Sequence, residues 1–376
     1  MTQLEVALLV LASAGTAYYI FSTLALIAHF NRYEPEGTSY PKVSVLKPVR
    51  GIDANARENF ITFLEQDYPD YEVLFGILNH DDPVEPLVRE VIEGIGHASL
   101  HIGSSILGTN NKVRILHNLV SRANGEILVI TDADTRAEPD FLMRIVAPFE
   151  DDGVGMVTCM YRGVGGMSIS DALEGLHMTC LFAPGVACAN ALKGIDFGLG
   201  ATIAIRRETL ELIGGFEPIR HYLADDFQIG RRAAMIGHEV KLSDYVMDIV
   251  LSGESLINIL ARELRWSVTQ RVSRPFGQLG LAMTYGLAYA TAFCIVTDFS
   301  LLGWSVLGCV VVVRTITAAA GARSMGDHQV FKRLWLLPAR DLLSFIIWVM
   351  GWFSRTVKWR GRKLRLTPDG RIIRVK

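Results

Sequence analysis

Several motifs that identify common enzyme classes are missing from this sequence. It contains no G-x-S-x-G motif and no P-loop, so hydrolase and kinase functions have no support. None of its nine histidines has metal-ligand spacing. Its five cysteines show neither paired nor metal-ligand spacing. We interpret them as small buried hydrophobic residues in a reducing compartment.

Net charge is also small, because 37 Lys and Arg residues nearly balance 39 Asp and Glu residues. Residues 40–275 have ordinary globular composition and contain no basic and aromatic patch that would follow a phosphate backbone. We therefore expect no nucleic-acid partner. The tail, residues 356–376, differs: from Lys358 onward it holds eight Lys and Arg residues against one Asp. By the positive-inside tendency, this basic tail belongs on the cytoplasmic face of a membrane.

Apolar residues are abundant, at 50% of the chain. They are concentrated at the two ends. The first run, Leu4–Phe30, contains one charge, Glu5, and is longer than the about 20 residues needed to cross a bilayer. A cleavable signal peptide is the alternative, but the basic start is missing and the apolar run is too long. Residues 1–32 are therefore predicted to be a transmembrane anchor.

A second apolar region covers residues 280–355 and contains three candidate membrane segments. They are Leu281–Thr297, Leu301–Val313 and Leu334–Phe353. Charges in or beside such segments are costly unless they are paired or lie near an interface. Arg314, Arg340 and Asp341 are charges of this kind. Either they lie at headgroup depth, or Arg314 pairs with Asp341.

The number of crossings conflicts with the charge distribution. Three full crossings after residue 275 would place the globular part and the basic tail on opposite sides of the membrane. If both are cytoplasmic, one segment must be re-entrant or lie in the interface. The weakest spanning candidates are Leu281–Thr297 and the charged Leu334–Phe353.

Strands and helices alternate in the globular part. Predicted strands are Val43–Leu46, Tyr71–Leu78, Ser99–Ile102 and Glu126–Ile130, and predicted helices are Asp53–Gln66, Val84–Glu93 and Asn111–Ala123. This alternation predicts an α/β domain with a mainly parallel sheet covered on both faces. Ligands bind beyond the carboxyl ends of the strands in such sheets.

Two acidic clusters follow predicted strands. Asp132-x-Asp134 can hold Mg²⁺ or Mn²⁺, which bind through one or two carboxylates together with substrate phosphates. The ordinary alternative is a turn, where Asp is common. Asp81-Asp82 can accept hydrogen bonds from a nucleotide base or ribose, but Asp82 can equally cap the next helix.

A third acidic pair, Asp225-Asp226, precedes a predicted helix at Gln228–Met235. One aspartate is expected to cap this helix. The other can act as a general base, because burial and like charge would raise its pKa toward the working range.

Two arginines and a tryptophan share a predicted helix, Ser255–Val272. Arg262 and Arg265 are three residues apart and lie on one face, with Trp266 one turn from Arg262. Two guanidinium groups suit a diphosphate. A Trp with basic neighbours before an apolar segment is equally typical of a membrane-interface belt.

The order of these motifs resembles the D, D, D, (Q/R)xxRW signature of GT-A-fold, family-2-like glycosyltransferases. Ser44–Pro48, Gly51–Asp53 and His80–Pro83 are more specifically similar to ceramide glucosyltransferases. Gly198–Ala201 ahead of Arg206–Leu210 is shared with bacterial hopanoid-biosynthesis glycosyltransferases. The resemblance covers nearly the whole chain and implies a cytosolic GT-A domain at residues 40–275.

The resemblance also implies a role for each site residue. Asp82 would contact the uridine of a UDP-sugar, Asp132 and Asp134 would hold Mg²⁺ or Mn²⁺ on its diphosphate, and Asp226 would deprotonate the acceptor hydroxyl, with inversion at the anomeric carbon. Arg262 and Arg265 would stabilise the leaving diphosphate, and Trp266 would flank the acceptor. Processive relatives usually have Gln where this chain has Arg262, which favours transfer of a single sugar.

The function expected from this resemblance is transfer of a hexose from a UDP-sugar to a lipid hydroxyl, with UDP-glucose and ceramide as substrates. The first alternative is UDP-GlcNAc and bacteriohopanetetrol. Further alternatives are a polyprenyl-phosphate sugar transferase, a processive polysaccharide synthase and a non-enzymatic scaffold. The expected location is a multi-pass membrane protein whose catalytic domain faces the cytoplasm, with a bacterial inner membrane favoured over the ER or Golgi.

Overall fold

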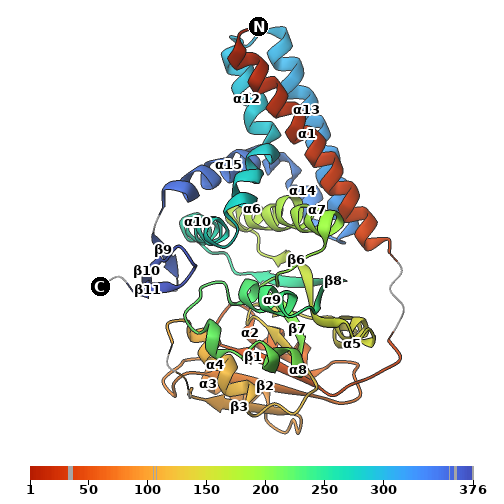
Figure 1. The fold of residues 1–376 in the computed structure, drawn as a ribbon, viewed down its shortest axis with the longest axis vertical. Helices are drawn as coiled ribbons and strands as arrows, with labels where there is room; N and C mark the ends of the chain where they lie inside the picture. Colours follow the sequence, from red (N-terminus) through yellow and green to blue (C-terminus); the bar gives the residue numbers. More distant parts are fainter. Residues whose placement is uncertain (33–36, 105, 107, 355, 360–361, 375–376) are drawn as a thin grey trace.

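The computed structural model describes residues 1–32, 37–104, 106, 108–354, 356–359 and 362–374. It has three regions along its long axis (Figure 1). An α/β domain lies at one end, a bundle of long helices lies at the other, and a layer of helices separates them. The N-terminal helix and the long C-terminal helices lie together at one end, although the α/β domain separates them in the sequence (Figure 1).

One half of the main sheet is parallel. Its strands are β1 (Val43–Pro48), β2 (Tyr71–Ile77), β3 (Ala98–Ile102) and β4 (Ile127–Thr131). β1 pairs in parallel with β2 and β4, and β2 pairs in parallel with β3. This is the arrangement expected from the alternating pattern, and it brings the carboxyl ends of these strands to one edge.

The other half of the sheet is mixed. Its strands are β5 (Thr135–Arg136), β6 (Val154–Gly165), β7 (Thr202–Arg206) and β8 (Glu239–Leu251). β7 pairs antiparallel with both β4 and β6, β5 pairs antiparallel with β8, and β6 pairs in parallel with β8. The order across the sheet is β3-β2-β1-β4-β7-β6-β8-β5.

Helices pack on the sheet and bury two apolar cores. They are α2 (Ala56–Leu64), α3 (Glu85–Val91), α4 (Asn111–Val120), α5 (Phe141–Val146), α8 (Arg207–Leu212) and α9 (Asp225–Met235). One core contains Phe60, Phe63 and Phe75. The other contains Leu116 and Leu119 of α4. Burial of these side chains is the main source of stability for the domain.

Two expectations about helix starts are wrong. The helix predicted at Asp53–Gln66 is shorter, because α2 begins at Ala56, after Asn55, a residue in the left-handed conformation with φ of 55°. Neither Asp225 nor Asp226 caps α9, because both lie in its first turn and Ala224 precedes them. Carboxylates in a first turn still interact favourably with the positive end of the helix.

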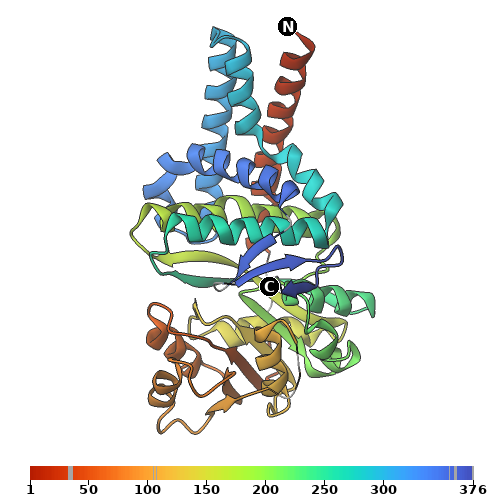
Figure 2. The same cartoon turned by 90° about the vertical axis from the view of Figure 1, so that its left-hand side faces the viewer.

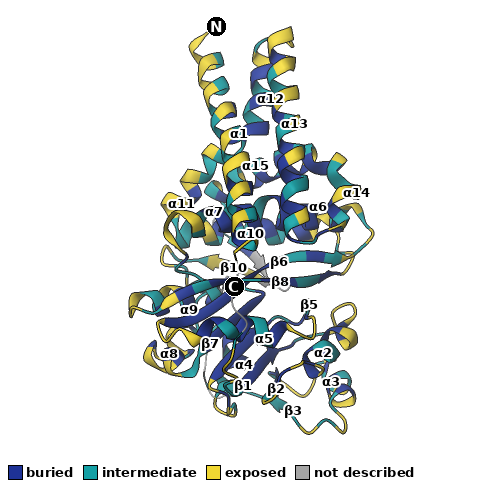
Figure 3. Cartoon of the chain, turned by 90° about the vertical axis from the view of Figure 1, so that its right-hand side faces the viewer, coloured by how far each residue is buried: buried dark blue, intermediate teal, exposed yellow. Residues whose placement is uncertain are grey.

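A layer of helices covers the sheet edge that faces the bundle (Figures 1 and 3). It contains α6 (Ile169–His177), a π-helical segment (Met178–Phe182), α7 (Ala183–Lys193), α10 (Leu256–Ser273), α11 (Pro275–Gly280), α14 (Gln329–Arg333) and α15 (Leu337–Phe353). The 3₁₀ turns of the chain are Ala147–Glu150, Glu217–Ile219, Leu281–Thr284 and Leu334–Leu336.

Three helices form the bundle and stand side by side in both views (Figures 1 and 2). They are α1 (Gln3–Phe30), α12 (Gly286–Val296) and α13 (Leu301–Ser324). Their outward side chains include exposed Phe21, Leu24, Val312 and Ile316. Within the described residues, four helices are long and apolar enough to cross a membrane, or five if the bent pair Pro275–Thr284 and Gly286–Val296 counts as one span.

The charged residues of the C-terminal region are paired. Arg314 of α13 forms two hydrogen bonds with Asp341 of α15, at 2.7 and 2.9 Å, which confirms the predicted pair. Both side chains are buried. Arg340, the neighbour of Asp341, pairs instead with Glu263 of α10. Pairing therefore removes the cost of unpartnered charge in this apolar region.

The basic tail forms a small sheet that the sequence did not predict. Its antiparallel strands are β9 (Thr356–Trp359), β10 (Arg362–Leu366) and β11 (Ile372–Arg374). Residues 360–361 and 375–376 of the tail lie outside the described residues. Buried Val357, Leu364 and Ile372 pack with Leu223 and with Val268 of α10. The tail thus lies against the helix that carries the R-x-x-R-W motif.

Candidate active site

A cavity of about 1640 Å³ lies between the carboxyl edge of the sheet and the helical layer. It is lined by every residue that the sequence analysis selected, namely Asp82, Asp132, Asp134, Asp226, Arg262, Arg265 and Trp266. The same cavity reaches Tyr18 of α1, Tyr285 before α12 and Trp348 of α15. One continuous space therefore joins the acidic motifs to the helices of the apolar regions.

A buried lysine, Lys47 of β1, holds the D-x-D turn in place. The Lys47 ammonium donates to the Asp132 carbonyl at 2.8 Å and to the hydroxyls of Thr131 and Thr135 at 3.3 Å. It also lies 3.7 Å from the centre of the Phe63 ring. Burial lowers the pKa of Lys47 to about 7. Sequence reasoning missed this residue, although a lysine within a strand buried on both faces is an available signal.

The D-x-D carboxylates fit a divalent cation. Burial, followed by the charges of Asp132 and Asp53, raises the pKa of Asp134 to about 6, so carboxylates are crowded at this point. A divalent cation relieves such crowding, and oxygen ligands suit Mg²⁺ and Mn²⁺. The described residues contain no group of three or more His, Cys, Asp or Glu residues placed to hold a metal. The remaining ligands would have to come from a diphosphate or from water.

Lys112, at the start of α4, joins two of the acidic motifs. Its ammonium lies 2.7 Å from the Asp132 carboxylate and 3.7 Å from that of Asp225. The Asn110 side chain, which caps α4, donates to the Asp225 carboxylate at 3.3 Å. Asp225 is therefore held by the start of α4, which distinguishes it from Asp226.

Asp226 faces the cavity and has an environment suited to a base. One carboxylate oxygen accepts a hydrogen bond from the Phe227 amide at 2.8 Å. The other lies where a side chain at Gly200 would come within 2.9 Å of it. Burial, followed by the charge of Asp225, raises the pKa of Asp226 to about 7. A group with this pKa accepts a proton efficiently near neutral pH.

Asp82 connects the loops that follow the first two strands. Its carboxylate accepts hydrogen bonds from the amides of Gly51, at 2.8 Å, and Val84, at 3.2 Å. These bonds involve the oxygen Oδ1 of the side chain. Asp82 thus shapes the wall of the cavity at the end of β2, while it also lines that cavity.

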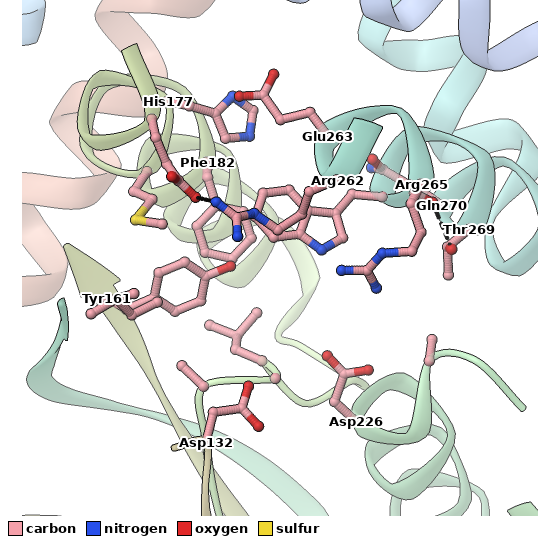
Figure 4. Close-up of a pocket in the computed structure, with 18 of the residues that line it drawn as sticks. Asp132, Tyr161, His177, Phe182, Asp226, Arg262, Glu263, Arg265, Thr269 and Gln270 are labelled. Carbon is pink, nitrogen blue, oxygen red and sulfur yellow. Dashed lines mark hydrogen bonds and ion pairs between the residues drawn. The ribbon is translucent and has the colours of Figure 1, made fainter. Parts of the chain in front are cut away.

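The two arginines of α10 have different surroundings (Figure 4). Arg262 forms an ion pair with Glu174 of α6 and another with Glu254 at 3.0 Å. Arg265 points toward Asp226, and within the described part of the chain its side chain has no ion pair. Burial and the charge of Arg262 lower the pKa of Arg265 to about 10, so it stays cationic at neutral pH. Arg265 is therefore the guanidinium available to an anion.

Aromatic side chains from β6 and α6–α7 complete the cavity wall. Tyr161 and Phe182 stack with ring centres 4.6 Å apart. Trp266 stacks on His177 with centres 6.1 Å apart, and the Arg262 guanidinium lies 5.9 Å from the Trp266 ring. Sequence reasoning did not select Tyr161, His177 or Glu174. The apolar stretch Met178–Val186 looks like ordinary core in the sequence, yet part of it lines the cavity.

Comparisons with known proteins agree with this geometry. The family described as Glycosyl transferase family 21 matches residues 7–372. Ceramide glucosyltransferase 1 of Caenorhabditis elegans is 22% identical over 357 residues, covering 91% of this chain and 75% of the relative. Ceramide glucosyltransferase 3 of the same organism is 22% identical over 363 residues, covering 90% of this chain and 75% of the relative.

A solved structure supports the fold. Mannosyltransferase PcManGT from Pyrobaculum calidifontis, in complex with GDP-Man and Mn²⁺, has a TM-score of 0.55 and 20% identity. The similarity covers 92% of this chain and 99% of that chain. The match to the family over residues 7–372 decides the assignment. This chain belongs to glycosyl transferase family 21, and it is a glycosyltransferase that uses a nucleotide-sugar donor.

Proposed function

We propose that this enzyme transfers one glucose from UDP-glucose to the hydroxyl of ceramide, with inversion at the anomeric carbon. The observation that carries the proposal is the single cavity that joins the acidic motifs to the apolar helices. A nucleotide-sugar is water-soluble, whereas ceramide stays in the bilayer. An enzyme that joins them needs one space open to both. The names of the two relatives support glucose and ceramide as the substrates.

The donor occupies the sheet side of this cavity. Asp82 contacts the uridine, and Arg262 and Arg265 bind the diphosphate. Charge-assisted hydrogen bonds from guanidinium groups suit phosphate oxygens. Arg265 is already directed toward the space above Asp226 (Figure 4), while Arg262 must exchange Glu174 or Glu254 for the diphosphate.

Asp132 and Asp134 hold the Mg²⁺ or Mn²⁺ ion. When bound, this ion supplies positive charge that offsets the charge on the leaving diphosphate. Lys47 keeps the turn in place through the Asp132 carbonyl. Lys112 neutralises part of the negative charge beside it.

Asp226 removes the proton from the ceramide hydroxyl as that oxygen attacks the anomeric carbon. Attack comes from the face opposite the UDP leaving group, so the configuration inverts and a β-linked product forms. Arg265 stabilises the negative charge that develops on the diphosphate. Asp226 and Arg265 lie on opposite sides of the same space (Figure 4). The acceptor can therefore lose its proton on one side while UDP leaves on the other.

The acceptor enters from the apolar helices, with its hydrocarbon chains left in the bilayer. Tyr18, Tyr285 and Trp348 line the cavity on that side. Trp266 flanks the headgroup between the two ends. Aromatic residues of this kind are typical of the boundary between headgroups and hydrocarbon.

A membrane topology with three crossings accounts for this arrangement. In this topology α1, the bent pair Pro275–Thr284 and Gly286–Val296, and α13 cross the bilayer. α15, which runs across the base of the bundle, lies in the interface (Figure 1). The catalytic domain and the basic tail are then on the same, cytoplasmic side. We propose this topology because it removes the conflict in the number of crossings, with Leu334–Phe353 as the segment that does not span.

Purified protein in nanodiscs with Mn²⁺ provides the test. UDP-[¹⁴C]glucose with ceramide should give a labelled lipid that carries one sugar, and Asp226→Asn should not form it. UDP-[¹⁴C]GlcNAc with bacteriohopanetetrol serves as the comparison pair. Labelled product from that pair alone would contradict the proposed donor and acceptor, whereas UDP binding without transfer to any lipid would contradict the proposed reaction.

A further inference from the structure

The helix that carries Arg262 and Arg265 is held from its other side by a buried ion pair. Glu263, between the two arginines, points away from Asp226 (Figure 4). Its carboxylate accepts two hydrogen bonds from Arg340 of α15, at 2.8 and 2.7 Å. The side chains of Arg340 and Glu263 are 0% and 3% exposed. A two-point bond between buried groups fixes the direction of a side chain as well as its distance.

Asp341, which follows Arg340 on α15, makes a similar contact with the helical bundle. Asp341 forms a two-point ion pair with Arg314 of α13. Arg314 also donates to the Cys180 carbonyl at 3.1 Å, and its guanidinium lies 4.6 Å from the centre of the Tyr19 ring of α1. Two consecutive residues of α15 therefore bond to α10 in one direction and to the helical bundle in the other.

Arg265 depends on the position of α10. Within the described residues it has no ion pair, so the helix backbone is what aims it at the cavity. Arg262 has carboxylate partners of its own on α6 and at residue 254. Within the described part of the chain, a small rotation of α10 would redirect Arg265 without breaking an ion pair or a side-chain hydrogen bond of that residue. Displacements of about 1 Å in a group that binds the reacting centre reduce rates severely.

We infer that Glu263 and Arg340 are positioning residues for the donor site. We also infer that the Asp341–Arg314 pair couples the position of α10, through α15, to the helices of the membrane bundle. The inference rests on the proposed role of Arg265 in binding the diphosphate. Neither Glu263 nor Arg340 touches the donor in this account. They keep α10 from rotating about its axis. Replacing either residue should therefore weaken binding of the donor more than binding of the acceptor.

The test uses the full-length protein in nanodiscs. Glu263→Gln keeps the shape of the side chain and removes its charge. We expect the Kd of UDP and the KM of UDP-glucose to rise about tenfold, while the KM of ceramide changes by less than about twofold. The control is Arg162→Gln, which breaks the 2.7 Å ion pair with Asp248 and leaves α10 untouched. It should lower the melting temperature without changing the Kd of UDP.

Several outcomes would overturn the inference. One is a Glu263→Gln protein that melts earlier, as Arg162→Gln does, but binds UDP like the wild type. If Glu263→Gln does not fold, Arg340→Lys keeps the charge and loses the two-point geometry. It should still weaken UDP binding, and unchanged binding would overturn the inference.

A separate variant tests the link between α15 and the membrane bundle. Asp341→Asn should raise the Kd of UDP in the same direction as Glu263→Gln, by a smaller factor. An unchanged Kd in this variant would overturn the link to the bundle. A wild-type protein that binds no UDP would overturn the proposed function and this inference together, whereas normal wild-type binding with unaltered variants would overturn only the inference.

Discussion

Lys112 forms a 2.7 Å ion pair with Asp132 and so places one positive charge among the acidic motifs of the site. The charge of Lys112 also opposes the rise in the pKa of Asp226, which burial and Asp225 produce. A single residue at the start of α4 thus influences both the predicted metal ligands and the predicted base.

Replacing this lysine should shift the pH dependence of the enzyme. In Lys112→Met, the pKa of Asp226 should rise further, because the nearby positive charge is gone. The acidic limb of kcat/KM should move to higher pH by about one unit or less. The pH profile of glucose transfer measures this shift. Lys193→Met, at the exposed end of α7, is the control, and equal profiles for the two variants would contradict the electrostatic role of Lys112.

The wild-type enzyme should itself show an acidic limb near pH 7. The pKa of Asp226 is raised to about 7, so the fraction of the ionised base increases as pH rises through that value. Transfer should therefore increase from pH 6 to pH 8 and then level off with respect to this group. Asp226→Asn should lower kcat by about 10² to 10⁴ and leave UDP binding intact. If the Asp226→Asn protein keeps both the acidic limb of the pH profile and the wild-type kcat, another group is the base.

Gly15 of α1 and Gly286 of α12 allow these two helices of the bundle to pack with their backbones in close contact. A Cβ at Gly15 would lie 2.4 Å from the backbone of Gly286, so α1 and α12 cross with no room for a side chain. Gly15→Ala should cost about 1–3 kcal/mol and lower the melting temperature. Gly308→Ala on α13 is the matched control, because nothing lies within 4 Å of its added Cβ. Equal melting temperatures for the two variants would contradict this packing.

Much of the site was predictable from sequence because its motifs are local. Asp132-x-Asp134 follows a strand, and Arg262 and Arg265 lie three apart and share one helix face. That spacing fits a membrane-interface belt as well, so the site assignment of the two arginines came from the resemblance of the R-x-x-R-W motif. The Arg314–Asp341 pair was predictable for a different reason. Unpaired charge in an apolar segment is costly, and these residues are opposite charges in neighbouring segments.

The residues that sequence reasoning missed are partners at long range. Glu174 meets Arg262 only because α6 and α10 pack together, and Lys47 reaches the D-x-D turn from the neighbouring strand. The antiparallel β7 and the sheet formed by the tail depend on pairing between distant segments. Such contacts follow from tertiary packing, which overrides local pattern.

If one cavity serves both the nucleotide-sugar and the membrane lipid, Gly185→Trp should block the lipid and spare the nucleotide-sugar. Gly185 of α7 lines the cavity, and a Cβ there would lie 3.4 Å from the Tyr18 hydroxyl. In nanodiscs, we predict that this variant binds UDP with wild-type affinity, while the KM of ceramide rises at least about tenfold or transfer is lost. Wild-type transfer to ceramide by a folded Gly185→Trp protein would contradict the claim.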